Sequence, residues 1–140
     1  MTTDTISKEN LSRDFLLSVF EAAFMDPIAR GERSILVAES GVNLMVTVPQ
    51  ADRVLDYIVL SASWGLRKDI AREVKLEHAN KLNIEYLAVR AMIDDAGDVL
   101  ANYYFLLPAE ISKKYFILVF KRFAIFSKSA VNDIFKDLLM

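Results

Sequence analysis

The sequence predicts an α+β fold, in which helices cover an antiparallel sheet in the order α-β-β-β-α-β-β-α. Three segments carry apolar residues at helical spacing, and between them lie runs of β-branched residues broken by short turns. Strands and helices do not alternate one by one, as a parallel doubly wound sheet requires. An antiparallel sheet with helices packed on it is therefore the predicted architecture.

The first helix is expected to begin at Asn10 or Ser12, whose side chains can accept hydrogen bonds from the free amides of a helix start. It should end near Met25, because Pro27 disfavours helical geometry at the residue before it. Apolar residues at three- and four-residue spacing give this helix one apolar face: Leu11, Phe15, Val19, Ala22 and Ala23.

Three strands should follow, at about residues 34–38, 43–48 and 54–61. Turn chemistry separates them: Gly41 can adopt a positive φ, and Pro49 can end a strand. Because the connections are short, the strands should form an antiparallel meander.

A second helix is predicted after Asp69, the expected N-cap, with Ile70, Ala71, Val74, His78 and Leu82 at helical spacing. Asn80 and Asn83 lie one turn apart where this helix must end. Asparagine is unfavourable in a helix interior but suits a terminus, because it bonds nearby backbone and tolerates left-handed geometry. We interpret both asparagines first as residues that end the helix.

Two further strands, at residues 86–93 and 99–108, should form a hairpin with a tight turn at Asp95 and Gly97. Asp94 and Asp98 bring two more carboxylates to this turn. The alternating ligands and terminal glutamate of a calcium loop are missing, so a solvated turn is predicted rather than a metal site.

Ser112 should cap a last helix that can run to Leu139 without glycine or proline, over about 40 Å. Most of its phenylalanines lie near one stripe and are predicted core residues. Ile117, Leu118 and Ile125 lie off that stripe and widen the apolar surface beyond what one sheet would cover.

Composition and charge restrict the function. The 140 residues are enough for one domain, residues 1–140, that buries its own core without cysteines, of which there are none. With 17 Lys and Arg against 19 Asp and Glu and both signs mixed, the chain lacks the basic footprint of a nucleic-acid binder. No uncharged run approaches the ~20 residues of a membrane span, and the start lacks a secretory pattern. We expect a cytoplasmic protein with no cofactor, no metal, no nucleic-acid partner and no membrane contact.

Apolar residues make up 54 % of the chain, and along residues 101–107 both faces of the predicted strand are largely apolar. A sheet covered by helices on one side would leave the second face to a partner or a second copy. We therefore predict a homodimer with a protein client, and expect the interface residues to be Tyr103, Phe105, Ile117 and Ile125.

Catalysis has little support. His78 is the only histidine, no G-x-S-x-G pattern is present, and a metal site would need carboxylates alone. The alternative is a small-molecule sensor or enzyme, with a pocket between sheet and helices near the end of the central helix. Its expected ligand contacts are His78, Asn80, Asn83 and Arg90.

The segment "LEHANKLNIEYLAVRAMIDDAGDVL" and the order of elements resemble the YbjN family of bacterial sensory-transduction regulators over roughly residues 33–126. The likeness consists of the N-x-x-N helix end, a strand, an Asp-Gly hairpin and a helix rich in phenylalanine. It departs at Leu82, where the family often has an aromatic residue, and in a hairpin with fewer acidic residues. The resemblance implies a fold like that of type III secretion chaperones, frequent dimers and a non-enzymatic binding role.

Overall fold

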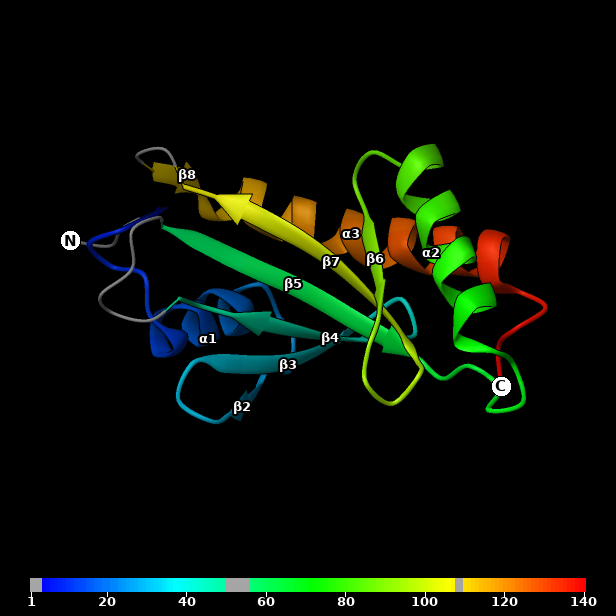
Figure 1. Ribbon diagram of the computed structural model, residues 1–140. Coiled ribbons are helices and arrows are strands. Elements are labelled where there is room, and N and C mark those ends of the chain that lie inside the picture. Colours follow the sequence, from blue (N-terminus) through cyan, green and yellow to red (C-terminus); the bar gives the residue numbers. More distant parts are fainter. Residues whose placement is uncertain (1–3, 50–55, 108–109) are drawn as a thin grey trace.

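A computed structural model describes residues 4–49, 56–107 and 110–140 (Figure 1). The elements are β1 (Thr5–Ser7), α1 (Arg13–Ala22), β2 (Ile28–Arg30), β3 (Ser34–Glu39), β4 (Val42–Thr47), β5 (Tyr57–Trp64), α2 (Arg72–Glu85), β6 (Arg90–Ile93), β7 (Val99–Leu106), β8 (Glu110–Ser112) and α3 (Lys113–Phe135).

Six strands form one antiparallel sheet in the order β2-β3-β4-β5-β7-β6, and β1 pairs with β8 in a separate two-stranded sheet. In Figure 1, α1 and α3 lie behind the six-stranded sheet, α2 stands at its β6 end, and no helix covers the face toward the viewer. The predicted α+β class and antiparallel sheet are confirmed. The short strands β1, β2 and β8 were not predicted.

The core lies between the sheet and the two helices behind it. Phe20 of α1 packs edge-on against Phe116 and Phe120 of α3, with ring centroids 5.6 and 4.8 Å apart. Tyr103 of β7 meets Phe123 of α3 at 6.2 Å. Alternate strand residues complete the core, as the period of two in a strand requires: Ile35, Val37, Leu44, Val46, Ile58, Leu60, Val99 and Ala101.

Two of the predicted helix starts are confirmed. The hydroxyls of Ser12 and Ser112 each accept a hydrogen bond from an amide three residues on, at 3.0 Å. Asn10 instead accepts from the amide of Ser7. The N-cap prediction for Asp69 is wrong: the N-cap is Ala71, two residues later, and α2 begins at Arg72. The Oδ1 atom of Asp69 lies 3.8 Å from the Nε atom of Arg67.

The meander is confirmed where it is described; the predicted start of the third strand falls outside the described residues. β3 and β4 join through Ser40 and Gly41, both at positive φ, as a two-residue hairpin turn of primed type requires. α3 ends at Phe135 rather than Leu139, because the chain turns there and Leu139 forms a bridge with Leu66.

Candidate binding surfaces

The helix-free face of the sheet carries an unusual charge pattern. By register, this face bears alternate residues from all six strands, including Leu36, Met45, Ser61 and Asn102 in one row across the sheet. Among the paired residues of the described strands, the charged side chains on this face are Arg30 of β2 and Arg90 of β6, and none is acidic. We call this surface the open face.

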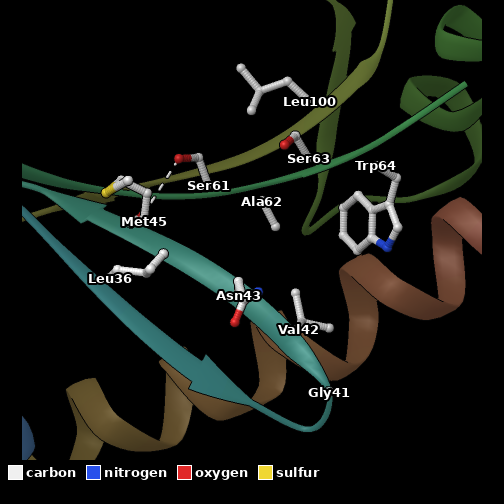
Figure 2. A pocket seen from close by; sticks show the side chains of 10 residues that line it. All are labelled: Leu36, Gly41, Val42, Asn43, Met45, Ser61, Ala62, Ser63, Trp64 and Leu100. Carbon is white, nitrogen blue, oxygen red and sulfur yellow. Dashed lines mark hydrogen bonds between the residues drawn. The ribbon is translucent and has the colours of Figure 1, made fainter. Parts of the chain in front are cut away.

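The sheet forks at one end of the open face. β4 and β5 pair at Met45 with Ser61, Val46 with Leu60 and Thr47 with Val59, and then separate. Figure 2 shows the two strands diverging with α3 behind the gap. The opening has a volume of about 600 Å³ and is lined by Leu36, Gly41, Val42, Asn43, Met45, Ser61, Ala62, Ser63, Trp64 and Leu100.

Some backbone groups in this fork have no strand partner in the part of the chain that the structure describes. In an antiparallel ladder, alternate residues direct both backbone polar groups toward the same neighbour. Continuing the pairing of Met45 with Ser61 would bring Asn43 opposite Ser63, but β4 and β5 are not paired there. Because β3 and β7 engage the flanking residues, the backbone groups of Asn43 and Ser63 face the gap.

A second free edge lies on β7. β6 pairs only with residues 99–102 of β7, whereas β5 pairs with the whole strand. The amide of Leu107 bonds to Asp56 on the β5 side, so the alternation directs the N–H and C=O groups of Tyr104 and Leu106 outward. No described residue hydrogen-bonds to these groups. We call residues 103–106 the β7 free edge, and Figure 1 shows it extending beyond β6.

Large apolar side chains surround the β7 free edge. Tyr104 and Leu106 are 52 % and 59 % exposed on the open face. On the helix side, the ring of Tyr115 lies 6.0 Å from that of Phe105 and is also half exposed. A separate hollow of about 350 Å³ lies between the α2–β6 connection and α3, lined by Glu85, Tyr86, Leu87, Ala88, Val89, Phe126 and Ser129.

Side-chain hydrogen bonds account for the short β6. The amide group of Asn83 in α2 bonds both backbone groups of Ala91, donating to its oxygen at 2.9 Å and accepting from its nitrogen at 2.6 Å. The Tyr86 hydroxyl donates to Asp133 of α3 at 2.6 Å, and this bond raises the pKa of Tyr86. The predicted strand at residues 86–93 is therefore wrong in its first half, which is held toward the helices.

The four predicted interface residues occupy different environments. Phe105 is 6 % exposed and belongs to the core, and Tyr103 is half-buried beside it. Ile117 lines a groove of about 280 Å³ between α1 and α3. Ile125 is 52 % exposed, two turns from the exposed Leu118 on the outward side of α3. Their place in an interface remains a prediction, for which Ile125 is the accessible member.

The four predicted ligand contacts do not converge. The Nδ1 atom of His78 lies 2.7 Å from the carbonyl oxygen of Val74, and its ring packs beside Phe135. Asn80 is exposed on α2, and the amide of Asn83 is bound to β6. Arg90 alone lies on the open face. Asn83 thus closes a strand edge rather than the helix end, where Tyr86 is the cap residue.

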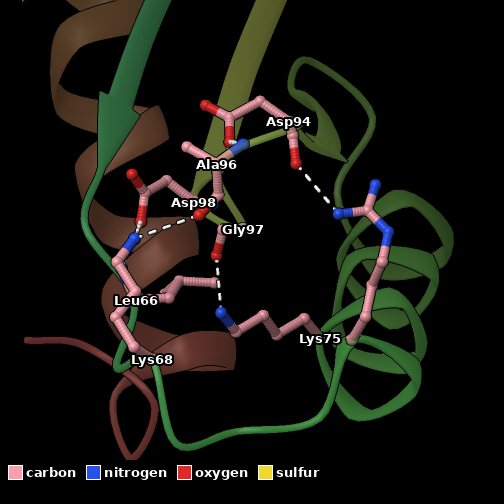
Figure 3. A network of polar contacts seen from close by, with 8 residues as sticks. Leu66, Lys68, Lys75, Asp94, Ala96, Gly97 and Asp98 are labelled. Atoms are coloured by element: carbon pink, nitrogen blue, oxygen red, sulfur yellow. Dashed lines mark hydrogen bonds and ion pairs between the residues drawn. The ribbon is translucent and has the colours of Figure 1, made fainter.

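The β6–β7 turn is tied to its surroundings by cations (Figure 3). Lys68 bonds Asp98 at 3.1 Å, and the buried Lys75 donates to the Gly97 carbonyl at 2.7 Å. The Asp98 carboxylate accepts from the Leu66 amide at 2.9 Å; this bond first, and Lys68 second, lower the pKa of Asp98.

Arg72 completes the attachment by donating to the carbonyls of Ile93 and Asp94. The carboxylate of Asp94 accepts from the amides of Ala96 and Asp98 within the turn. Among the described residues, no three His, Cys, Asp or Glu side chains gather as a metal site would require. None of the helices in the described ranges is long and apolar enough to cross a membrane.

The fork and the β7 free edge are candidate binding features that sequence reasoning missed. Both arise where neighbouring strands stop pairing, and strand propensity does not reveal that. The one available signal was the mixture of Asn43, Ser61, Ser63 and Asn102 with large apolar residues on one strand face. That mixture is typical of a face that no helix covers.

Comparison with known proteins identifies relatives of this arrangement. The model of the YbjN family, described as "Putative bacterial sensory transduction regulator", matches residues 12–133. No curated protein sequence matches the chain.

Two solved structures share the fold. The crystal structure of YbjN from E. coli, described there as "a putative transcription regulator", has a TM-score of 0.65 and 14 % identity, with 91 % of this chain and 94 % of that chain covered. An uncharacterized protein from Methanothermobacter thermautotrophicus has a TM-score of 0.63 and 12 % identity, with 91 % and 99 % covered.

Proposed function

Because the chain belongs to the YbjN family, we propose that it is a cytoplasmic, non-enzymatic regulator or chaperone-like adaptor that dimerises and binds a partner polypeptide through an apolar surface. One observation carries the partner-binding part of this proposal. Between exposed apolar side chains, the β7 free edge presents outward backbone groups at Tyr104 and Leu106, and no residue in the described ranges bonds to them.

Such an edge is suited to strand addition. An extended polypeptide that pairs with an open strand gains main-chain hydrogen bonds, and pockets for its alternate side chains supply specificity. Here the first set of side chains would meet Tyr104 and Leu106, and the opposite set would meet Tyr115. All three side chains are more than half exposed in the free chain, so a partner would remove apolar surface from water.

For the second copy we propose the outward side of α3. Leu118 and Ile125 are seven residues apart and both about half exposed, so they form a short apolar stripe. Lys114, Lys121 and Arg122 flank it without an acidic residue between them. A dimer across this stripe brings like charges together, so it should tighten as salt screens them.

The partner-binding proposal is tested by replacing Leu106. Its backbone N–H faces away from β5, so Leu106→Pro removes an outward donor while leaving the β5–β7 ladder in place. Leu106→Ala is the matched control, because it loses the side chain but keeps the N–H. Tagged wild type and both variants would be used to capture polypeptides from a lysate of the source organism.

A polypeptide that wild type and Leu106→Ala retain and Leu106→Pro loses supports strand addition at β7. A polypeptide retained equally by all three, or the absence of any retained polypeptide, contradicts it. Circular dichroism of each variant shows whether the fold is intact.

The dimer is tested by Ile125→Asp, with Asn80→Asp as control. Both changes add one negative charge at an exposed helix position, the first on the α3 stripe and the second on α2. Light scattering after size-exclusion chromatography should show that only Ile125→Asp shifts a dimer to a folded monomer. A wild-type monomer, or a dimer unaffected by Ile125→Asp, would refute the α3 interface.

A further inference from the structure

A hollow of about 270 Å³ lies on the open face beside the β7 free edge. It is lined by Arg90, Ala91, Met92, Asn102 and Tyr104. Arg90 of β6 stands directly opposite Asn102 of β7 in the register, and Tyr104 follows two residues along on the same face. A guanidinium, a carboxamide and a phenol therefore border one small space.

Asn102 is the most informative of these residues. It is only 8 % exposed, and its side-chain nitrogen has a thioether as its partner, the sulfur of Met92 at 3.5 Å. A thioether is a weak acceptor, whereas buried amides ordinarily bond to oxygen. The amide donor of Asn102 thus lines the hollow without a strong acceptor.

Arg90 also has no counter-charge within the described ranges. No described residue forms an ion pair with it, and the open face bears no acidic side chain among its paired strand residues. The carboxylates of the hairpin turn, at the other end of β6, are engaged elsewhere: Asp98 bonds Leu66 and Lys68, and Asp94 bonds amides of its own turn. A guanidinium in such a place favours a planar anion with two oxygens.

We propose that this hollow binds a carboxylate group, held by Arg90 and by the side-chain amide of Asn102. Met92 and Tyr104 form apolar walls, so the group that bears the carboxylate is an apolar or aromatic one. The single cation suits a carboxylate better than a phosphate dianion. The proposal does not rest on strand addition at β7: the carboxylate would be held by Arg90 and Asn102, whereas strand addition uses the outward backbone groups of Tyr104 and Leu106, and only the Tyr104 side chain borders both.

The test uses sodium benzoate and its uncharged isostere benzamide as probes, followed by ¹⁵N–¹H NMR of the purified protein. Benzoate should move the side-chain amide signals of Asn102 and the backbone signals of Arg90 and Tyr104 in a saturable way. Benzamide should bind at least about tenfold more weakly, because it cannot form the charge-assisted pair.

Arg90→Gln should weaken benzoate binding by about tenfold or more. Arg30→Gln is the matched control, since it removes the other arginine of the same face and should leave binding unchanged. Absence of saturable shifts at this hollow, equal binding of benzoate and benzamide, or undiminished binding by Arg90→Gln would each overturn the proposal. An unchanged spectrum elsewhere shows that the variants are folded.

Two sources of a carboxylate are separated by a further arm. A blocked pentapeptide with a central glutamate, flanked by valine and threonine, is compared with its glutamine counterpart. Tighter binding of the glutamate peptide than of benzoate, lost in Arg90→Gln, assigns the carboxylate to a polypeptide side chain. Benzoate binding without any difference between the two peptides assigns it to a small free acid.

Discussion

The two halves of β7 are held in different ways. Residues 99–102 have β5 on one side and β6 on the other, and the turn that leads into them is fastened by Lys68, Arg72 and Lys75. Residues 103–106 pair only with β5, and no described residue hydrogen-bonds to the outward backbone groups of Tyr104 and Leu106. In β7, residues 99–102 thus have a strand partner on both sides, and residues 103–106 have one on the β5 side.

The fold protects the outer edge of β6 and leaves the β7 free edge accessible. The outer edge of β6 is an equal hazard for unwanted pairing, yet Asn83 occupies both backbone groups of Ala91 there. No corresponding side chain among the described residues occupies Tyr104 or Leu106. This contrast between a protected edge and an unprotected one supports the proposal that the β7 free edge binds a partner.

The largest effect on stability is expected from a charge introduced on the core-facing side of residues 103–106 of β7. Phe105→Asp places a carboxylate in the core against Phe116 and should cost more than about 4 kcal/mol, enough to unfold many domains. Tyr104→Asp, one residue earlier but on the open face, should leave a folded protein. Thermal melts followed by circular dichroism compare the two. A folded Phe105→Asp protein would mean that the side chain is free to leave the core.

A smaller effect is expected at the protected edge. Asn83→Ala leaves the N–H and C=O of Ala91 without partners and should destabilise the protein by about 2 kcal/mol. Asn80→Ala, one turn earlier and without a side-chain hydrogen bond among those described, should change stability by less than about 0.5 kcal/mol. Urea unfolding measures both. Equal effects of the two changes would contradict the edge-closing role of Asn83.

The stabilisation that the β6–β7 turn gives the fold should depend on pH, because it involves the Asp98 carboxylate. Its pKa is lowered in the folded state, first by the Leu66 amide and then by Lys68, so it stabilises the fold above the ordinary aspartate pKa of about 3.9. That stabilisation is lost as pH falls through the lower folded value. Asp98→Asn should therefore melt below wild type at pH 7, and the two melting temperatures should converge below about pH 4. A constant difference across this range would contradict the assignment.

Much of the fold was predictable because it depends on local chemistry. Ser112 precedes a long apolar-periodic segment and caps it, and the Ser40 and Gly41 turn joins two β-branched runs. The Asp69 cap failed because the chain continues as a turn through Ile70, which packs against the core before the helix begins. Propensity identifies candidate caps but does not decide which one tertiary packing permits.

The binding surfaces were less predictable because they depend on where pairing stops. Residues 86–93 look like one strand, but bonds from Asn83 and from Tyr86 to Asp133 shorten it by half. The bond from Asn83 spans 8 residues, but the bond from Tyr86 reaches α3, 47 residues away in the sequence. The β7 free edge exists because β6 is short. No pattern within residues 99–108 could therefore predict it.

The last test of the difference between the inner and outer edges of β7 uses the wild-type protein. Hydrogen exchange should be fast at the amides of Tyr104 and Leu106 and slower by at least about 100-fold at Tyr103 and Phe105, whose amides bond to β5. This alternation follows only if the outer edge is free. Equal protection at all four amides would show that something covers the edge. Protection of Tyr104 and Leu106 that rises with protein concentration would place the second copy on β7, and the outward side of α3 would then be left for the partner polypeptide.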